Sequence, residues 1–226
     1  MQQKFVAVTG AAGALGSAVT STLAGAGYRV IGIDHAQKIS GGSALALELA
    51  GVDLTEPSAA KRAFDRVKTE CGSLSALVNL AGGFAWETIE EGSIETWDHL
   101  FNLNLRTTLN ATQAALPLLL AQGGSIVNVG AAAAAKAANG MGAYAASKSA
   151  VARLTESLAA ELLTRGVRVN AVLPSILDTP ANRAQMPDAP FDRWVATAAL
   201  ADVIAFLISD AAAAVTGALV PVTGQV

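Results

Sequence analysis

The sequence predicts a single α/β domain in which a mostly parallel β-sheet carries helices on both faces. Apolar runs of strand length alternate with helical stretches along the 226 residues, and each parallel crossover needs a helix to return to the next strand. Hydrophobic residues make up 52% of the chain and charged residues 15%, which fits strands buried on both faces and excludes a disordered chain. No proline- or serine-rich linker divides the sequence, so we expect one domain over residues 1–226.

The expected elements follow from short apolar runs and from longer amphipathic stretches. A strand, a helix and a second strand open the chain at Phe5–Thr9, Ala14–Ala24 and Arg29–Asp34. Later strands are expected at Gly51–Asp53, Ala76–Leu80, Ser125–Val129, Val167–Val172 and Ala218–Pro221. Later helices are expected at Glu56–Cys71, Thr96–Gln122, Tyr144–Arg165 and Ala201–Ser209. The segment Ser175–Trp194 contains prolines and little periodicity, so we expect a long loop of the kind that serves as a lid.

Composition excludes several classes of protein. The lone Cys71 rules out an internal disulfide and a thiolate zinc cluster, and His35 and His99 lie far apart in sequence, so no metal site is expected. A net charge of -3 without a basic stripe makes nucleic acid an unexpected partner. No stretch approaches the roughly 18 uninterrupted apolar residues of a membrane span, and the first residues are a poor secretory signal, so we expect a cytoplasmic protein.

A glycine-rich turn follows the first expected strand and opens the first expected helix. Gly10, Gly13 and Gly16 lie in this turn, where a pyrophosphate needs close backbone approach and the free N–H groups of a helix N-terminus. Asp34 ends the second expected strand, at the place where a carboxylate binds the adenosine ribose hydroxyls. A carboxylate repels a 2′-phosphate, so NAD(H) is favoured over NADP(H). The alternative for Asp34 is a solvated strand end.

Tyr144 and Lys148 are four positions apart at the start of an expected helix and share one face. One cation about 4.5 Å from a phenol, at an effective dielectric near 20, contributes roughly 3.7 kcal/mol, or somewhat under three pKa units. The pair is therefore sufficient for proton donation near neutral pH. In isolation the same spacing is common on solvated helices.

Motifs over almost the whole chain resemble those of the short-chain dehydrogenases/reductases. In chain order they are Thr9–Gly16, Asp34, Asp53–Leu54, Asn79–Gly82, Asn104–Leu105, Tyr144–Lys148, Pro174–Thr179 and Val215–Gly224. The resemblance implies a Rossmann-type, doubly wound, seven-stranded sheet and hydride transfer between a nicotinamide and a small-molecule substrate. It also implies a homodimer or homotetramer, and a dinucleotide-binding half over residues 1–130 followed by a catalytic and substrate-loop half over residues 131–226.

The resemblance assigns roles position by position. For the cofactor, the matching residues are Gly10, Gly13, Leu15 and Gly16 at the pyrophosphate, Asp34 at the ribose, Asp53 and Leu54 at the adenine, Asn79, Ala81 and Gly82 at the end of the fourth strand, and Pro174 and Thr179 near the nicotinamide amide. Tyr144 matches the general acid/base. Lys148 matches the lysine that holds the nicotinamide ribose and lowers the pKa of the tyrosine, and Asn104 matches the residue that positions a water between that lysine and solvent.

Two positions depart from the usual pattern of the family. Ala14 stands where the middle glycine of the turn is usual, and we expect only a local change there. Ala131 stands thirteen residues before Tyr144, where the family has a serine that hydrogen-bonds the substrate oxygen. Losing such a donor typically costs about a hundred- to a thousandfold in rate, so ordinary ketone reduction is an unfavourable reaction for this chain.

Many bacterial-type short-chain reductases of unassigned substrate resemble this chain, and the dihydropteridine reductase-like branch of the family is similar to it at both departures and at Ala81–Gly82–Gly83–Phe84. The resemblance implies an NADH-dependent reduction of a planar conjugated acceptor, such as a quinonoid dihydropterin, which does not need a polarising serine. Phe84, Trp86 and Trp194 are candidates to flank a flat substrate beside Ala131, with aromatic core packing as the alternative.

Two other functions compete with this reading. One is a general alcohol or carbonyl dehydrogenase in which Asn128, Ser147 or a water replaces the serine. The other is a dinucleotide-binding regulatory or scaffold protein without efficient chemistry. The presence of Tyr144, Lys148 and Asn104 argues against the second, because a pure binder needs no proton relay.

Overall fold

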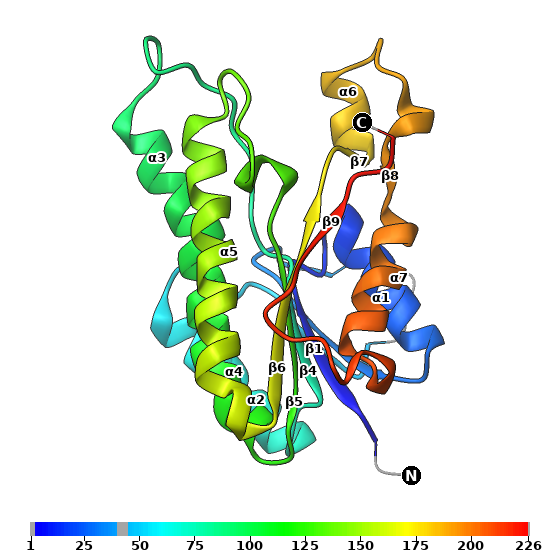
Figure 1. The fold of residues 1–226 in the computed structure, drawn as a ribbon. Coiled ribbons are helices and arrows are strands. Elements are labelled where there is room, and N and C mark those ends of the chain that lie inside the picture. The colour runs from blue at the N-terminus through cyan, green and yellow to red at the C-terminus, as the bar shows by residue number, and fades with distance from the viewer. Residues whose placement is uncertain (1–2, 40–44, 226) are drawn as a thin grey trace.

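The computed structural model describes residues 3–39 and 45–225 (Figure 1). Its centre is a seven-stranded sheet in the order β3-β2-β1-β4-β5-β6-β9, in which every pair of neighbours is parallel. The strands are β1 (Phe5–Thr9), β2 (Arg29–Ile33), β3 (Leu47–Leu49), β4 (Ala76–Asn79), β5 (Gly124–Val129), β6 (Val167–Pro174) and β9 (Leu219–Val222). The predicted Rossmann-type, single-domain α/β fold is confirmed.

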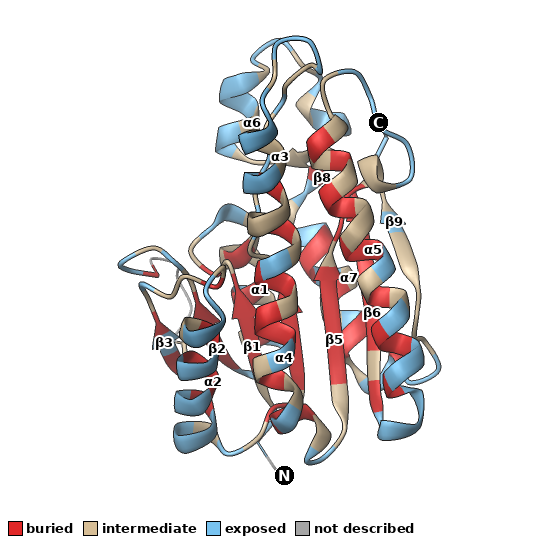
Figure 2. Ribbon diagram, turned by 90° about the vertical axis from the view of Figure 1, so that its left-hand side faces the viewer, coloured by how far each residue is buried: buried red, intermediate tan, exposed pale blue. Residues whose placement is uncertain are grey.

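Helices cover both faces of the sheet (Figure 1). On one face lie α1 (Ala14–Gly25) and α7 (Thr197–Ile208), and on the other lie α2 (Pro57–Cys71), α4 (Thr107–Leu120) and α5 (Gly142–Leu162). Successive residues of a strand point to opposite faces, so Val6 and Val8 of β1 join the core under α1 and α7, while Ala7 joins the core under α2 and α4. In Figure 2 the inner strands are accordingly buried over most of their length, whereas the helices are exposed along their outer sides.

The edge strand is displaced from its predicted position. Gly51–Asp53 is not a strand: β3 is Leu47–Leu49. Gly51 adopts a φ of 70°, which turns the chain out of the extended conformation. Asp53 then belongs to a turn, in which its carboxylate accepts hydrogen bonds from the backbone and the hydroxyl of Thr55.

The predicted helix Thr96–Gln122 is divided into three parts. The chain forms α3 (Ile94–Leu100), a π-helical stretch at Phe101–Arg106 and then α4. Ser93 begins α3 as its N-cap, with its hydroxyl accepting a hydrogen bond from the backbone of Thr96. The wider π turn lies where Asn104 turns inward, and π-helical turns are frequent at functional sites.

The predicted long loop Ser175–Trp194 contains secondary structure of its own. It forms β7 (Leu177–Asp178), α6 (Pro180–Gln185) and a 3-10 turn at Phe191–Arg193, and β7 pairs with β8 (Val195–Ala196). Arg183 binds the Asp178 carboxylate through two nitrogens and lies over the Phe191 ring, 4.7 Å from its centroid. This lid segment, residues 175–196, lies above the carboxyl ends of the strands (Figure 1).

The sequence predicts neither a membrane-spanning helix nor a metal site. Among residues 3–39 and 45–225, no helix has the length and apolar character needed to cross a membrane. In the same part of the chain, no group of three or more histidine, cysteine, aspartate or glutamate side chains is placed to hold a metal ion.

Candidate active site

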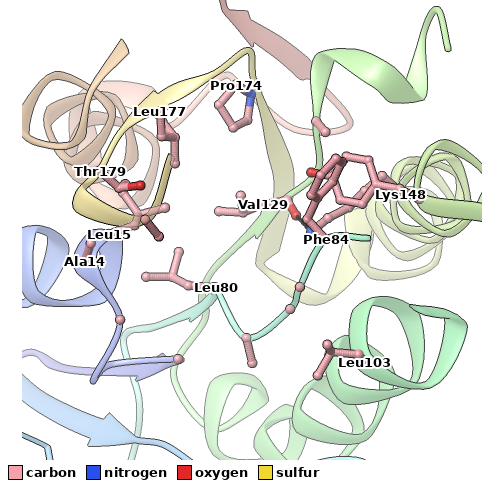
Figure 3. Close-up of a pocket in the computed structure, with 18 of the residues that line it drawn as sticks. Ala14, Leu15, Leu80, Phe84, Leu103, Val129, Lys148, Pro174, Leu177 and Thr179 are labelled. Atoms are coloured by element: carbon pink, nitrogen blue, oxygen red, sulfur yellow. Dashed lines mark hydrogen bonds between the residues drawn. The ribbon is translucent and has the colours of Figure 1, made fainter. Parts of the chain in front are cut away.

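A cavity of about 1780 Å³ opens at the carboxyl ends of the strands and runs under the lid segment (Figure 3). Parallel α/β sheets bind their ligands at this edge. Sixteen of the residues singled out from the sequence line the cavity: Gly10, Gly13, Leu15, Gly16, Asp34, Asp53, Leu54, Ala81, Gly82, Phe84, Trp86, Ala131, Tyr144, Lys148, Pro174 and Thr179. Asn79, Asn104 and Trp194 do not line it.

The glycine turn leaves room for a ligand because its glycines pack against backbone. Gly10 has a φ of 68°, and a Cβ there would lie 2.8 Å from the backbone nitrogen of Ala81. A Cβ on Gly16 would overlap the carbonyl oxygen of Gly10. Gly13 is the N-cap of α1 and has no side chain to occupy the free N–H groups of the helix. The turn therefore fits the pyrophosphate of a dinucleotide.

Replacing Gly16 by alanine should damage this turn. The added methyl group overlaps the Gly10 carbonyl oxygen and the Ala11 backbone, so the turn has to move away from α1, and overpacking of this kind costs about 1–3 kcal/mol. We expect NADH affinity to fall at least tenfold (~1.4 kcal/mol), measured by calorimetry. Gly25→Ala is the matched control, because it lies on the same helix and its Cβ meets nothing within 4 Å. Unchanged NADH affinity in the Gly16 variant would contradict the assignment.

Two carboxylates lie at the end of the cavity near β2 and β3. Asp34 accepts hydrogen bonds from the backbone nitrogens of Ala12, at 2.9 Å, and Ala36, at 2.8 Å, so it joins the glycine turn to the end of β2. Asp53 accepts hydrogen bonds from Thr55, which hold the pKa of its carboxyl below the usual range. Both groups are therefore fixed in place as acceptors at this end of the cavity.

Tyr144 and Lys148 lie on α5 at the opposite end. The rings of Phe84 and Tyr144 pack edge to face, with their centroids 4.9 Å apart. The Lys148 ammonium donates a hydrogen bond to the carbonyl oxygen of Val129 at 2.9 Å. Burial raises the pKa of Tyr144 to about 12 and lowers the pKa of Lys148 to about 8. The predicted lowering of the tyrosine pKa is wrong for this structure, because desolvation dominates at Tyr144.

Asn104 lies behind the cavity wall and is fully buried. Its amide nitrogen donates to the Gly83 carbonyl and to the Ser147 hydroxyl, while its amide oxygen accepts from the Gly83 nitrogen at 2.8 Å. A Cβ on Gly82 would lie 2.6 Å from the Asn104 oxygen and 3.3 Å from the Lys148 nitrogen. Asn104 therefore fixes the loop after β4 against α5, next to the lysine.

Two predicted site residues belong to the packing rather than to the cavity. Asn79 is buried in the sheet, where its amide nitrogen donates to Thr112 and Asn128. Trp194 is 6% exposed and packs against Phe191, with ring centroids 4.9 Å apart. We therefore correct both assignments: Asn79 supports the floor of the site, and Trp194 anchors the lid segment.

The two side chains considered as replacements for the serine are both unavailable. Asn128 is fully buried, with its amide shared between Asn79 and Thr155. Ser147 is also fully buried, accepts from Asn104 and donates to the carbonyl oxygen of Tyr144. Ala131 lines the cavity with a methyl group. Of the three donors considered, only a water remains.

Sequence reasoning missed most of the apolar lining. Leu80 and Val129 lie at the middle of the cavity, and Leu103 lies on the side away from Ala14 and Leu15 of the glycine turn (Figure 3). Ile176, Leu177 and Met186 reach it from the lid segment. These residues have no chemical signature, and the expected lid was the only signal for the last three. A cavity with this lining suits a substrate with an apolar body.

A parallel sheet with a dinucleotide-sized cavity, a glycine turn and a tyrosine–lysine pair defines an NAD(P)-dependent oxidoreductase. A family model described as short chain dehydrogenase matches residues 4–190. The chain belongs to this family, the short-chain dehydrogenases/reductases, and is an enzyme.

Relatives of known name support the same family. D-threitol dehydrogenase of Mycolicibacterium smegmatis is 35% identical over 240 residues, covering 98% of this chain and 92% of the relative. A 3-oxoacyl-(acyl-carrier-protein) reductase of Thermotoga maritima is 31% identical, covering 99% of this chain and 98% of the relative. The structure of a 3-ketoacyl-(acyl-carrier-protein) reductase from Brucella melitensis complexed with NADH has a TM-score of 0.89 and 25% identity, covering 100% of both chains. These names favour the general alcohol or carbonyl reaction over the reduction of a dihydropterin.

Proposed function

We propose that the protein is an NADH-dependent oxidoreductase that interconverts an alcohol and a carbonyl group on a small substrate with an apolar body. The observation that carries this proposal is one continuous cavity, with the glycine turn at one end and Tyr144 and Lys148 at the other. The names of the relatives, which include dehydrogenases of alcohols and reductases of oxoacyl groups, support the reaction class.

The residues present fit a nicotinamide dinucleotide, which supplies or accepts a hydride when bound. Gly10, Gly13, Leu15 and Gly16 would hold the pyrophosphate, and Asp34 the adenosine ribose. Asp53 and Leu54 would lie beside the adenine, and Ala81, Gly82, Pro174 and Thr179 beside the nicotinamide half. All of them line the cavity.

The protein's own groups would move the proton. Tyr144 would give its hydroxyl proton to the substrate oxygen during reduction and take it back during oxidation. At a pKa of about 12 the hydroxyl is protonated at neutral pH, as the reducing direction requires. Lys148 would bind the nicotinamide ribose, while Asn104 holds the neighbouring loop in place.

The cofactor preference depends on Asp34. NADH should bind at least tenfold more tightly than NADPH, because placing a 2′-phosphate beside a fixed carboxylate costs more than the ~1.4 kcal/mol that tenfold represents. Asp34→Ala should narrow this difference. Calorimetry with both cofactors measures it, and equal affinities in the unmodified protein would overturn the preference.

A second candidate function is favoured by Ala131. A planar conjugated acceptor, such as a quinonoid dihydropterin, needs no donor at the serine position, and neither Asn128 nor Ser147 can supply one. Phe84, which is 51% exposed beside Tyr144, offers a flat wall for such a ring. NADH oxidation assayed with ketones, aldehydes, imines, quinones and quinonoid dihydropterin separates the two candidates by their kcat/KM values.

Three further proposals concern the assembly, the location and the two halves of the chain. We propose a homodimer or homotetramer in the cytoplasm, with a dinucleotide-binding half over residues 1–130 and a catalytic half over residues 131–226. Light scattering of the purified protein measures the assembly directly.

A further inference from the structure

Lys136 lies at the substrate end of the cavity, on the segment between the 3-10 turn Ala132–Ala134 and helix α5. This segment is held at both ends. The Ser149 hydroxyl of α5 donates to the carbonyl oxygen of Ala134 at 2.9 Å. At the other end, the Trp86 indole nitrogen donates to the carbonyl oxygen of Asn139 at 3.0 Å. The lysine therefore extends from a backbone that is fixed beside the cavity.

Charge is divided between the two ends of the cavity. The two carboxylates in its lining, Asp34 and Asp53, follow β2 and β3, whereas Lys136 and Lys148 follow β5. Strands β1 and β4 separate β2 from β5 in the sheet, which is about 14 Å at ~4.8 Å per strand. The described lining around Tyr144 thus contains cations and no carboxylate, in a protein whose net charge is -3.

Among the described residues that line this end of the cavity, Lys136 is the cation without a partner. Lys148 is buried and donates to Val129, and Arg183 of the lid segment is bound to Asp178 and does not line the cavity. Lys136 makes no ion pair or side-chain hydrogen bond with the residues that the structure describes. Gln185 of α6 lines the same cavity, and its amide also makes no hydrogen bond with the described residues.

We infer that the substrate carries a carboxylate, which Lys136 binds while the apolar body lies along Met141 and Met186. This inference rests on the proposed function, because the carboxylate must be attached to the molecule whose carbonyl reaches Tyr144. A lysine in this position selects among substrates without touching the reacting atoms. It differs from the proton relay in that its removal should change which substrates are used, and not the chemistry.

The test compares a medium-chain keto acid with its primary amide, which is neutral and has nearly the same shape. In the unmodified enzyme kcat/KM should be about tenfold higher for the acid, and this ratio should fall as salt is added. Lys136→Met should lower kcat/KM for the acid about tenfold and leave the amide within about twofold. Lys136→Arg should retain the preference. Lys68→Met is the matched control, because Lys68 is an exposed lysine of α2 that does not line the cavity.

A binding measurement separates this inference from the proposed function. Calorimetry of the saturated carboxylic acid of the same length, added to the protein with NADH, requires no turnover. If binding depends on Lys136 but no ketone is reduced, the alcohol–carbonyl function fails and the carboxylate site stands. Equal use of acid and amide by the unmodified enzyme, or an equal loss in the Lys136 and Lys68 variants, would overturn the inference.

Discussion

Replacing Tyr144 by phenylalanine should lower kcat with the best substrate at least a hundredfold. The variant loses the hydroxyl proton that Tyr144 presents to the cavity, and general acid catalysis typically contributes about 10²–10⁴-fold. The ring contact with Phe84 does not involve the hydroxyl, so folding and NADH affinity should change little. Steady-state kinetics and NADH calorimetry measure the two effects separately.

The Tyr144 variant has a matched control and a clear contrary outcome. Tyr28→Phe removes a phenol from a residue packed near α1, outside the cavity, and should leave kcat unchanged. If the Tyr144 variant turns over at the normal rate, the substrate is protonated by another group, and the planar-acceptor candidate with a water as acid gains support.

Replacing Ala131 by serine should raise the ratio of ketone to quinonoid reduction at least tenfold. Ala131 is a buried part of the cavity wall, and one donor at a developing oxyanion is typically worth about 10²–10³ in rate. A ratio of kcat/KM values is required, because packing around the new hydroxyl can lower either rate alone. Ala133→Ser, at another position of the same lining, is the control. An unchanged ratio would mean that a water already serves as the donor.

The residues predicted best from the sequence are those whose chemistry depends on local spacing. The three glycines lie within one turn and the Tyr144–Lys148 pair within one helix, so a short sequence pattern was enough to predict that they line the cavity. Asp34 could be predicted from its position alone, because it comes at the end of the second strand of one β-strand–helix–strand unit. The fold followed in the same way, because alternating strands and helices leave few arrangements of a parallel sheet.

The errors arise where the outcome depends on contacts across the fold. Gly51–Asp53 was expected to be a strand, but the positive φ of Gly51 directs the chain into a turn. Trp194 is an aromatic residue of the lid segment, and its burial and its contact with Phe191 show that it packs inward. The pKa of Tyr144 was predicted from the charge of Lys148 alone, whereas burial, which spacing does not reveal, raises it.

The most direct test of the central claim follows the hydride itself. NADH that carries deuterium at the transferring position of the nicotinamide is incubated with the enzyme and a ketone substrate, and the product is analysed by mass spectrometry. The proposed function predicts one deuterium on the carbinol carbon, formed by the unmodified enzyme and at least a hundredfold more slowly by the Tyr144→Phe variant. A product without deuterium, or labelled product formed equally fast by both enzymes, would contradict it.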